Sequence, residues 1–352
     1  MTGRRKNLHG SQLIAVRPWL TVVRSPEMAP SITSIAGDGI RTLRAFGSRI
    51  PVTGGLLAGS LEDAVSDRII LVTGASSGIG KSAALELGKA GGTILLVSRS
   101  KDKLNEVRRQ IELVGGEAHV HSCNLTDTDD LDRMAAEVLE QHGRVDILVN
   151  NAGKSIRRSV SNAYDRFHDY QRTMQLNYFG PVKLILDLLP GMRERGSGHI
   201  VNVSTIGLQT NTPRFSAYLA SKAALDAFSR SIAPEIIDDG VHVTTVYMPL
   251  VRTPMIAPTK IYDRFPTLSP EEAAHLITEA IRKRPKRIAT TLGNIGQLSY
   301  AVVPGAQDIV VNRAYKLFPE GEGKGDNGSK KSSDRESAEQ RAFARATRGV
   351  HW

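Results

Sequence analysis

Tyr218 and Lys222 stand four residues apart in a stretch that should be helical, with Ser221 between them. Residues at positions i and i+4 lie on one face of an α-helix, so the phenol and the ammonium group should be neighbours. A free phenol has a pKa near ~10, and a nearby positive charge favours its ionised form. The pair could therefore exchange a proton with a carbonyl or alcohol oxygen near neutral pH. Taken alone, this spacing is also common in ordinary surface pairs, so other motifs must decide.

A glycine-rich segment follows the apolar run 68–73 and opens a predicted helix. Gly74 permits a tight turn, Gly78 lets backbone N–H groups approach a pyrophosphate, and Gly80 lets the helix pack closely on the strand. The helix N-terminus adds a partial positive charge that attracts phosphate. These features indicate a dinucleotide site. Its candidate residues are Thr73, Gly74, Ser76, Ser77, Gly78, Ile79 and Gly80.

The end of the second predicted strand indicates which dinucleotide is preferred. An NAD site usually carries an acidic residue about 20 residues beyond the glycines, bound to the ribose 2′-hydroxyl. This chain has Val97-Ser98-Arg99-Ser100 there, with no carboxylate. Because Arg99 could bind a 2′-phosphate through two hydrogen bonds, the sequence favours NADPH over NADH. The alternative is that Arg99 is an ordinary solvated residue at the start of the next helix.

The elements that would position these residues alternate regularly along the chain. Apolar runs occur at 68–73, 93–98, 117–123, 145–150, 199–205 and 241–247, and helical stretches at about 79–90, 101–114, 128–142, 165–190 and 216–238. Strands that are apolar on both faces and separated by helices indicate a parallel sheet covered on both sides. With right-handed crossovers, this predicts a doubly wound, Rossmann-type α/β domain.

The predicted organisation is one catalytic domain with extensions. We expect a basic, partly amphipathic N-terminal extension over 1–66, the dinucleotide-binding domain over 67–292, a helical extension over 293–318, and a disordered linker with a basic tail over 319–352. Within the first extension, residues 31–50 combine apolar and arginine residues at helical spacing. That segment could dock on a membrane surface or pack on the protein body.

Composition excludes several protein classes. The chain has 352 residues and 46 Lys+Arg against 36 Asp+Glu, and its single cysteine, Cys123, cannot form an intramolecular disulfide. No run approaches the ~18 apolar residues of a membrane-spanning helix. Residues 1–60 carry a net charge of +6, residues 282–352 carry +7, and the body between them carries −3. We expect a cytoplasmic protein without specific nucleic-acid binding, whose basic ends either solubilise it or contact anionic lipid.

Two further motifs lie between the glycine segment and Tyr218-x-x-x-Lys222: the Asn150-Asn151-Ala152-Gly153 turn, and Asn177 in Met174-Gln175-Leu176-Asn177. Together and in this order, the four motifs resemble the short-chain dehydrogenase/reductase family over about 225 residues. The resemblance implies that Tyr218 is the general acid/base and that Lys222 also holds the nicotinamide ribose. It implies a water-linked proton path at Asn177 and a cofactor lining of Asn151, Ala152 and Gly153. Dimers or tetramers are usual in this family, so a homo-oligomer is expected.

The chain departs from the family pattern at three positions. The catalytic serine normally lies thirteen residues before the tyrosine, where this chain has Thr205 with Ser204 adjacent; either hydroxyl could hold the substrate oxygen. Asn124, followed by Leu125, replaces the aspartate that usually contacts adenine, and its side-chain oxygen could still accept a hydrogen bond. Pro249 is followed by leucine rather than glycine, and Thr253 matches the position expected to contact the nicotinamide amide.

Longer stretches resemble the reductase domain of bacterial fatty acyl-CoA reductases. They include 155–159, 164–177, TPRFSAYLASKAALDAFSR and 247–270. The resemblance implies NADPH-dependent reduction of a long-chain acyl-CoA or fatty aldehyde, and this chemistry needs no metal. The prolines and apolar residues of 250–270 fit a mobile lid over an apolar channel, and they fit ordinary loop packing equally. Arg157 and Arg158, or the basic run 282–287, could meet CoA phosphates, or could simply be solvated charges. Reduction of another ketone, such as a 3-oxoacyl thioester, steroid or xenobiotic, and a non-catalytic dinucleotide-binding scaffold are the alternatives.

Overall fold

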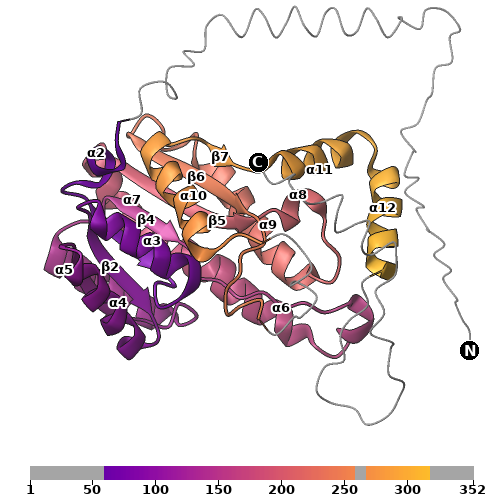
Figure 1. The fold of residues 1–352 in the computed structure, drawn as a ribbon, viewed down its shortest axis with the longest axis horizontal. Coiled ribbons are helices and arrows are strands. Elements are labelled where there is room, and N and C mark those ends of the chain that lie inside the picture. The colour runs from indigo at the N-terminus through magenta and orange to yellow at the C-terminus, as the bar shows by residue number, and fades with distance from the viewer. Residues whose placement is uncertain (1–58, 258–266, 318–352) are drawn as a thin grey trace, which may run out of the picture. The chain divides into compact units, whose positions relative to one another are not determined.

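The computed structural model describes residues 59–257 and 267–317, and within them a seven-stranded parallel sheet forms the centre of the fold (Figure 1). The strand order is β3-β2-β1-β4-β5-β6-β7. The order reverses between β1 and β4, where open α/β sheets bind ligands. The strands are β1 (Ile69–Thr73), β2 (Thr93–Ser98), β3 (Glu117–Ser122), β4 (Ile147–Asn150), β5 (Gly198–Thr205), β6 (Val241–Met248) and β7 (Arg287–Ile288). The predicted doubly wound α/β fold is confirmed.

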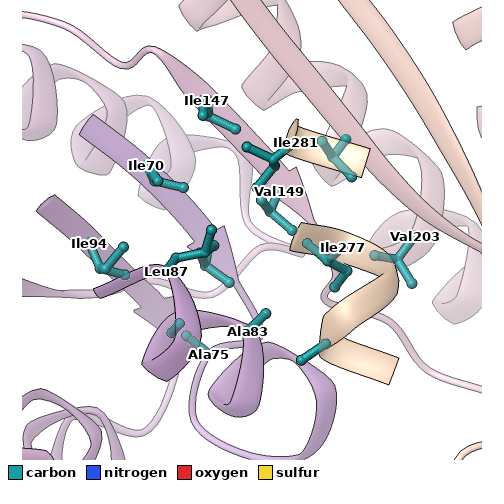
Figure 2. Close-up of a cluster of buried hydrophobic side chains, with 14 of the residues drawn as sticks. Ile70, Ala75, Ala83, Leu87, Ile94, Ile147, Val149, Val203, Ile277 and Ile281 are labelled. Atoms are coloured by element: carbon teal, nitrogen blue, oxygen red, sulfur yellow. The ribbon is translucent and has the colours of Figure 1, made fainter. Parts of the chain in front are cut away.

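Helices cover both faces of the sheet because the central strands are apolar on both sides. One face carries α3 (Gly78–Lys89), α4 (Lys101–Leu113) and α10 (Pro270–Lys283), and the other carries α5 (Thr128–His142), α7 (Gly180–Glu194) and α9 (Ser216–Ile232). Figure 2 shows the hydrophobic core on the α3, α4 and α10 side of the sheet. There Leu87 of α3 and Ile277 of α10 pack with Ile70 of β1 and Val149 of β4. The short α2 (Leu61–Val65) joins this core through Val65.

Local signals account for where several helices begin and end. The Asp127 side chain accepts hydrogen bonds from the first amides of α5, and Gly143 ends that helix with a left-handed φ of 73°. Ser269 and Glu272 form a capping box at the start of α10. These caps use residues within one turn of the boundary, and for that reason such boundaries can be read from the sequence.

The six predicted strands match the observed ones to within two residues at each end. The continuous helix predicted over 165–190 was wrong in detail. The chain forms α6 (Phe167–Met174), one π-helical turn (η2, Gln175–Phe179) and α7, which continues through Pro190 to Glu194. The helix predicted over 216–238 ends at Ile232 instead, because residues 233–240 turn into β6. The edge strand β7 was not predicted, since two residues carry no period.

The chain after β7 forms two helices, α11 (Thr291–Val302) and α12 (Pro304–Leu317), in the region where a helical extension was expected over 293–318. In Figure 1 they lie at the rim of the fold, beside the short α8 (Gly207–Thr210). The N-terminal extension up to residue 58, including the amphipathic segment 31–50, lies outside the described residues, as do 258–266 of the lid and the predicted disordered tail. Among the described helices, none is long and apolar enough to cross a membrane.

Candidate active site

Helix α9 brings Tyr218, Ser221 and Lys222 to the carboxyl end of β5. Lys222 is 4% exposed, and its Nζ donates a hydrogen bond of 2.8 Å to the main-chain oxygen of Val203. Burial lowers the pKa of Lys222 to about 8. The Tyr218 ring is half-buried and makes an edge contact with Phe215, with the ring centroids 6.3 Å apart. The ammonium group is therefore held rigidly one helical turn from the phenol.

Asn177 is completely buried and connects three segments. Its Nδ2 donates to the main-chain oxygen of Lys154 and to the Ser221 hydroxyl, both at 2.9 Å, and its Oδ1 accepts from the Lys154 amide at 2.8 Å. The Ser221 hydroxyl in turn donates to the main-chain oxygen of Tyr218 at 2.6 Å. The π-helical turn carries Asn177, and an extra residue in a helical turn redirects side chains in this way.

Gly153 lies against both of these groups. A Cβ atom at this position would be 3.3 Å from Oδ1 of Asn177 and 3.5 Å from Nζ of Lys222. Three of the predicted motifs, which are up to 69 residues apart in sequence, thus meet within a few ångströms.

The two candidate hydroxyls at the end of β5 have different surroundings. Ser204 is 5% exposed, and its Oγ has no hydrogen-bond partner among the described residues. Its side chain lies on the same side of β5 as that of Asn202, which donates to Ser229 of α9. Thr205 is half-buried, and its Oγ1 accepts a hydrogen bond of 3.1 Å from the Gly207 amide. Only Thr205 is both accessible and anchored.

The glycine segment is packed so closely that side chains would not fit. Gly74 has a φ of 68°, and a Cβ there would lie 2.9 Å from the Cα of Ala152. A Cβ on Gly80 would lie 2.4 Å from Nδ2 of Asn151 and 2.5 Å from the oxygen of Gly74. Asn151 donates to the main-chain oxygen of Thr73 at 2.9 Å. The turn after β1 and the turn after β4 therefore form one unit at the reversal of strand order.

The start of α3 suits an anionic group. Within the described residues, Ser77 makes no side-chain capping hydrogen bond and the first turn of α3 holds no acidic residue, so its first amides can donate to an anion. Gly78 has a φ of 55°, and a Cβ there would lie 3.1 Å from Cγ2 of Thr253. Thr253, which the sequence placed near the nicotinamide, therefore lies beside the predicted phosphate turn. These residues fit a dinucleotide pyrophosphate.

Other predicted cofactor residues lie at the carboxyl ends of neighbouring strands. Arg99 is exposed directly after β2. Asn124 follows β3, but its Oδ1 already accepts hydrogen bonds from the Thr126 hydroxyl and amide, at 2.9 and 3.3 Å. The expected free side-chain oxygen is thus engaged, which leaves the amide nitrogen of Asn124 as the group to meet a base. Leu125 and Pro249 are buried.

Several contacts around the site were not predicted from the sequence, although Asn150 itself belongs to the Asn150–Gly153 motif. Asn150 donates to Asn202 at 2.9 Å, and Asn202 donates to Ser229 at 2.8 Å, in a buried chain between β4, β5 and α9. The asparagine pair at the end of β4, Asn150-Asn151, was the available signal. The guanidinium of Arg214, a residue with a φ of 70°, lies 3.9 Å from the Tyr315 ring centroid and donates to its main-chain oxygen at 3.0 Å. No sequence motif near Arg214 or Tyr315 predicted this contact, because the two residues are 101 positions apart.

Two of the arginines that are candidates to bind CoA phosphates already form hydrogen bonds with carboxylates of the protein. Arg158 bonds to the buried Asp169 at 3.0 Å, and Arg282 bonds to Glu279 at 2.8 Å. His168 contacts Asp169, whereas His119 and His121 lie against His142. Within residues 59–257 and 267–317, no group of three or more His, Cys, Asp or Glu side chains is arranged to hold a metal ion.

Comparison with known proteins agrees with this geometry. The family model described as short chain dehydrogenase matches residues 68–261. An uncharacterised oxidoreductase of Mycobacterium tuberculosis is 52% identical over 83% of this chain and 87% of its own length. A fatty acyl-CoA reductase of Acinetobacter baylyi is 50% identical over 82% of this chain and 96% of its own length.

A solved structure of a metagenomic short-chain oxidoreductase in complex with NADP is 30% identical, with a TM-score of 0.55, over 64% of this chain and 97% of its own. The matched family, the parallel sheet and the arrangement of Tyr218, Lys222 and the glycine turn lead to one conclusion. The chain belongs to the short chain dehydrogenase family and is an NAD(P)-dependent oxidoreductase.

Proposed function

We propose that this protein uses NADPH to reduce a long-chain fatty acyl-CoA or fatty aldehyde, with Tyr218 as the general acid. The observation that carries the chemistry is the buried Lys222 ammonium, held by Val203 one turn from Tyr218 and beside Gly153. A cation that is desolvated and fixed in this way favours the phenolate, so it eases proton release from Tyr218.

The chain's own residues would act as follows. When bound, the dinucleotide supplies a hydride. Tyr218 donates its proton to the oxygen of the attacked carbonyl group, while Thr205 hydrogen-bonds to that oxygen; Ser204, being buried, is the less suitable hydroxyl. Lys222 keeps the phenol acidic, and Asn177 holds the Lys154 main chain in a position to relay a proton from water. For a thioester, the hydride adduct collapses by expelling CoA thiolate and yields the aldehyde.

The relatives support the choice of substrate. Besides the Acinetobacter protein, a fatty acyl-CoA reductase of Mycobacterium tuberculosis is 51% identical over 62% of this chain and 75% of its own length. A match over 288 residues of this chain necessarily includes α6, which packs on α9, the helix that carries Tyr218.

Arg99 supports the preference for NADPH. It is exposed immediately after β2, and the segment Val97–Ser100 contains no carboxylate that would repel a 2′-phosphate. Arg99→Asp should therefore raise the KM for NADPH strongly and lower the KM for NADH. An unchanged ratio between the two would contradict the assignment.

The test of function compares wild type, Tyr218→Phe and Tyr300→Phe in NADPH oxidation with acyl-CoAs and aldehydes of increasing chain length. Tyr300 is exposed on α11, so its hydroxyl serves as the matched control. We expect Tyr218→Phe to bind NADPH normally but to lose at least ~100-fold in turnover, as removal of a general acid does. Full activity of Tyr218→Phe would refute the acid. Activity confined to small ketones would refute the substrate class but not the acid.

A further inference from the structure

The helices α11 and α12 expose an apolar surface that the proposed reaction does not explain. Seven large apolar side chains on and between them are between 46% and 69% exposed. They are Ile295, Leu298, Tyr300, Val302, Val303, Ile309 and Val310. We call this set the hairpin surface. Contiguous apolar patches on a folded protein usually mark a contact with a partner or a membrane.

The charges around the hairpin surface have one predominant sign. Residues 288–307 contain no Asp, Glu, Lys or Arg at all. Arg284, Lys286 and Arg287 precede this stretch, and Arg313 and Lys316 follow it. Asp308 is the only acidic residue between 284 and 317, so this part of the chain carries a net charge of +4. An uncharged apolar stretch between basic residues is the pattern of segments that lie in the interface of anionic membranes.

The structure holds this surface firmly on the fold. Gly293 and Gly296 of α11 pack on Gln209 and Thr210 of α8, where a Cβ on Gly293 would come within 2.2 Å of Oε1 of Gln209. Arg287 donates to Gln297 of α11 at 2.9 Å. The hairpin is therefore anchored next to α8, which begins two residues after Thr205 at the carboxyl end of β5. A partner bound to the hairpin surface would therefore lie at the carboxyl end of the sheet, where the candidate active site also lies.

We propose that the hairpin surface docks on an anionic phospholipid bilayer. Charge argues against the other occupants. A second copy meeting the hairpin surface face to face would bring two segments of net charge +4 together. The chain's own residues 1–60, with a net charge of +6, would be repelled in the same way. A bilayer with anionic headgroups offers both an apolar interior for the exposed side chains and negative charge for the flanking arginines and lysines. The proposal does not depend on which carbonyl compound is reduced.

The test measures co-sedimentation of the full chain with sucrose-loaded vesicles. One set is phosphatidylcholine with about 30% phosphatidylglycerol, and the other is phosphatidylcholine alone. Wild type should sediment with the anionic vesicles, and Leu298→Asp/Val302→Asp should bind roughly tenfold more weakly or not at all. Leu113→Asp is the matched control, because Leu113 is an even more exposed leucine, at the end of α4, and should bind like wild type.

A fluorescent probe locates the contact. Cys123 is buried, with the pKa of its thiol raised to about 12, so a cysteine introduced as Leu298→Cys can be labelled selectively with an environment-sensitive dye. Its emission should shift to the blue on adding anionic vesicles, whereas the dye on Leu113→Cys should not respond.

Three outcomes would overturn the proposal: no sedimentation of wild type, equal sedimentation of wild type and Leu298→Asp/Val302→Asp, or loss of a dimer in that variant without any effect of vesicles. The second would assign binding to the basic ends, and the third would make the surface a contact between copies. Thermal unfolding and NADPH oxidation with a short, water-soluble aldehyde check that the variant is folded. Failure of that reaction in wild type would count against the proposed function alone.

Discussion

The ammonium group of Lys222 donates a hydrogen bond of 2.8 Å to the main-chain oxygen of Val203, and the lysine is almost completely buried. A buried cation is costly to the fold, and in the proposed reaction this cation acts on Tyr218. We therefore infer that stability is exchanged for chemistry at this position.

Replacing Lys222 should therefore stabilise the protein while abolishing catalysis. Burial lowers the pKa of Lys222 to about 8, from an ordinary value near ~10.4. Below pH 8 both the folded and the unfolded chain hold the proton, and the folded state bears the full cost. As the pH rises through this interval, only the unfolded chain keeps the proton, so wild type recovers stability. Lys222→Met should raise Tm at pH 7 by about 2–4 °C.

Calorimetry at several pH values checks this expectation. The difference in Tm between Lys222→Met and wild type should shrink between pH 8 and about 10.5. Lys103→Met, at an exposed position on α4, should leave Tm unchanged. A Lys222→Met protein less stable than wild type at pH 7 would mean that the bond to Val203 outweighs the desolvation cost.

A methyl group on Gly80 should disrupt the dinucleotide turn. It would lie 2.4 Å from Asn151 and 2.5 Å from the oxygen of Gly74, and backbone cannot move aside cheaply. Gly80→Ala should cost about 1–3 kcal/mol in unfolding free energy and weaken NADPH binding at least tenfold. Gly305→Ala is the control, since a Cβ there meets no atom of the described residues within 4 Å. Denaturant unfolding and titration calorimetry measure both effects, and normal NADPH affinity in Gly80→Ala would contradict the packing argument.

Arg214 should hold α12 on the fold. Its guanidinium stacks on Tyr315 and bonds to the main chain of the same residue. Because Arg214 has a positive φ, Arg214→Gly removes the side chain without adding backbone strain. Loss of the stacking and hydrogen bond, about 1–2 kcal/mol, should speed amide hydrogen exchange in 304–317 by roughly tenfold. Tyr315→Leu should reproduce part of the effect, and helix α5 provides the internal control. Unchanged exchange in α12 would show that other contacts hold it.

His199 should make the protein less stable in acid. The Thr244 hydroxyl donates to the Pro285 oxygen at 2.6 Å, so it accepts from Nε2–H of His199, which is neutral. Burial lowers the pKa of His199 to about 3. As the pH falls below ~6.5, His199 becomes protonated in the unfolded chain but stays neutral in the folded chain. His199 should therefore lower the free energy of unfolding by about 1.4 kcal/mol per pH unit down to pH 3, in addition to the effect of other groups.

Unfolding in urea between pH 7 and pH 4 checks this slope. His199→Gln, whose amide can donate to Thr244 in place of Nε2, should show a shallower dependence on pH. His168→Gln, at an exposed position, should behave like wild type. Equal slopes in all three proteins would show that His199 does not control the acid limb.

Local features of the sequence determined much of the fold and the site. Six strands followed from apolar runs, and the glycine turn after β1 followed from the need for a close backbone approach, because each depends on residues within a few positions. Tyr218 and Lys222 were paired by helical spacing alone. The caps of α5 and α10 belong to the same class, since a cap and its partner amides lie in one turn.

The tertiary structure alone decided which groups those residues meet. The oxygen of Val203, the main chain of Lys154 and the ring of Tyr315 come to Lys222, Asn177 and Arg214 across 19, 23 and 101 residues. Neither the π-helical turn around Asn177 nor the two-residue strand β7 produces a repeating pattern of apolar residues in the sequence. Periodicity and capping report on short-range geometry, whereas these contacts arise from the packing of elements that only the folded chain brings together.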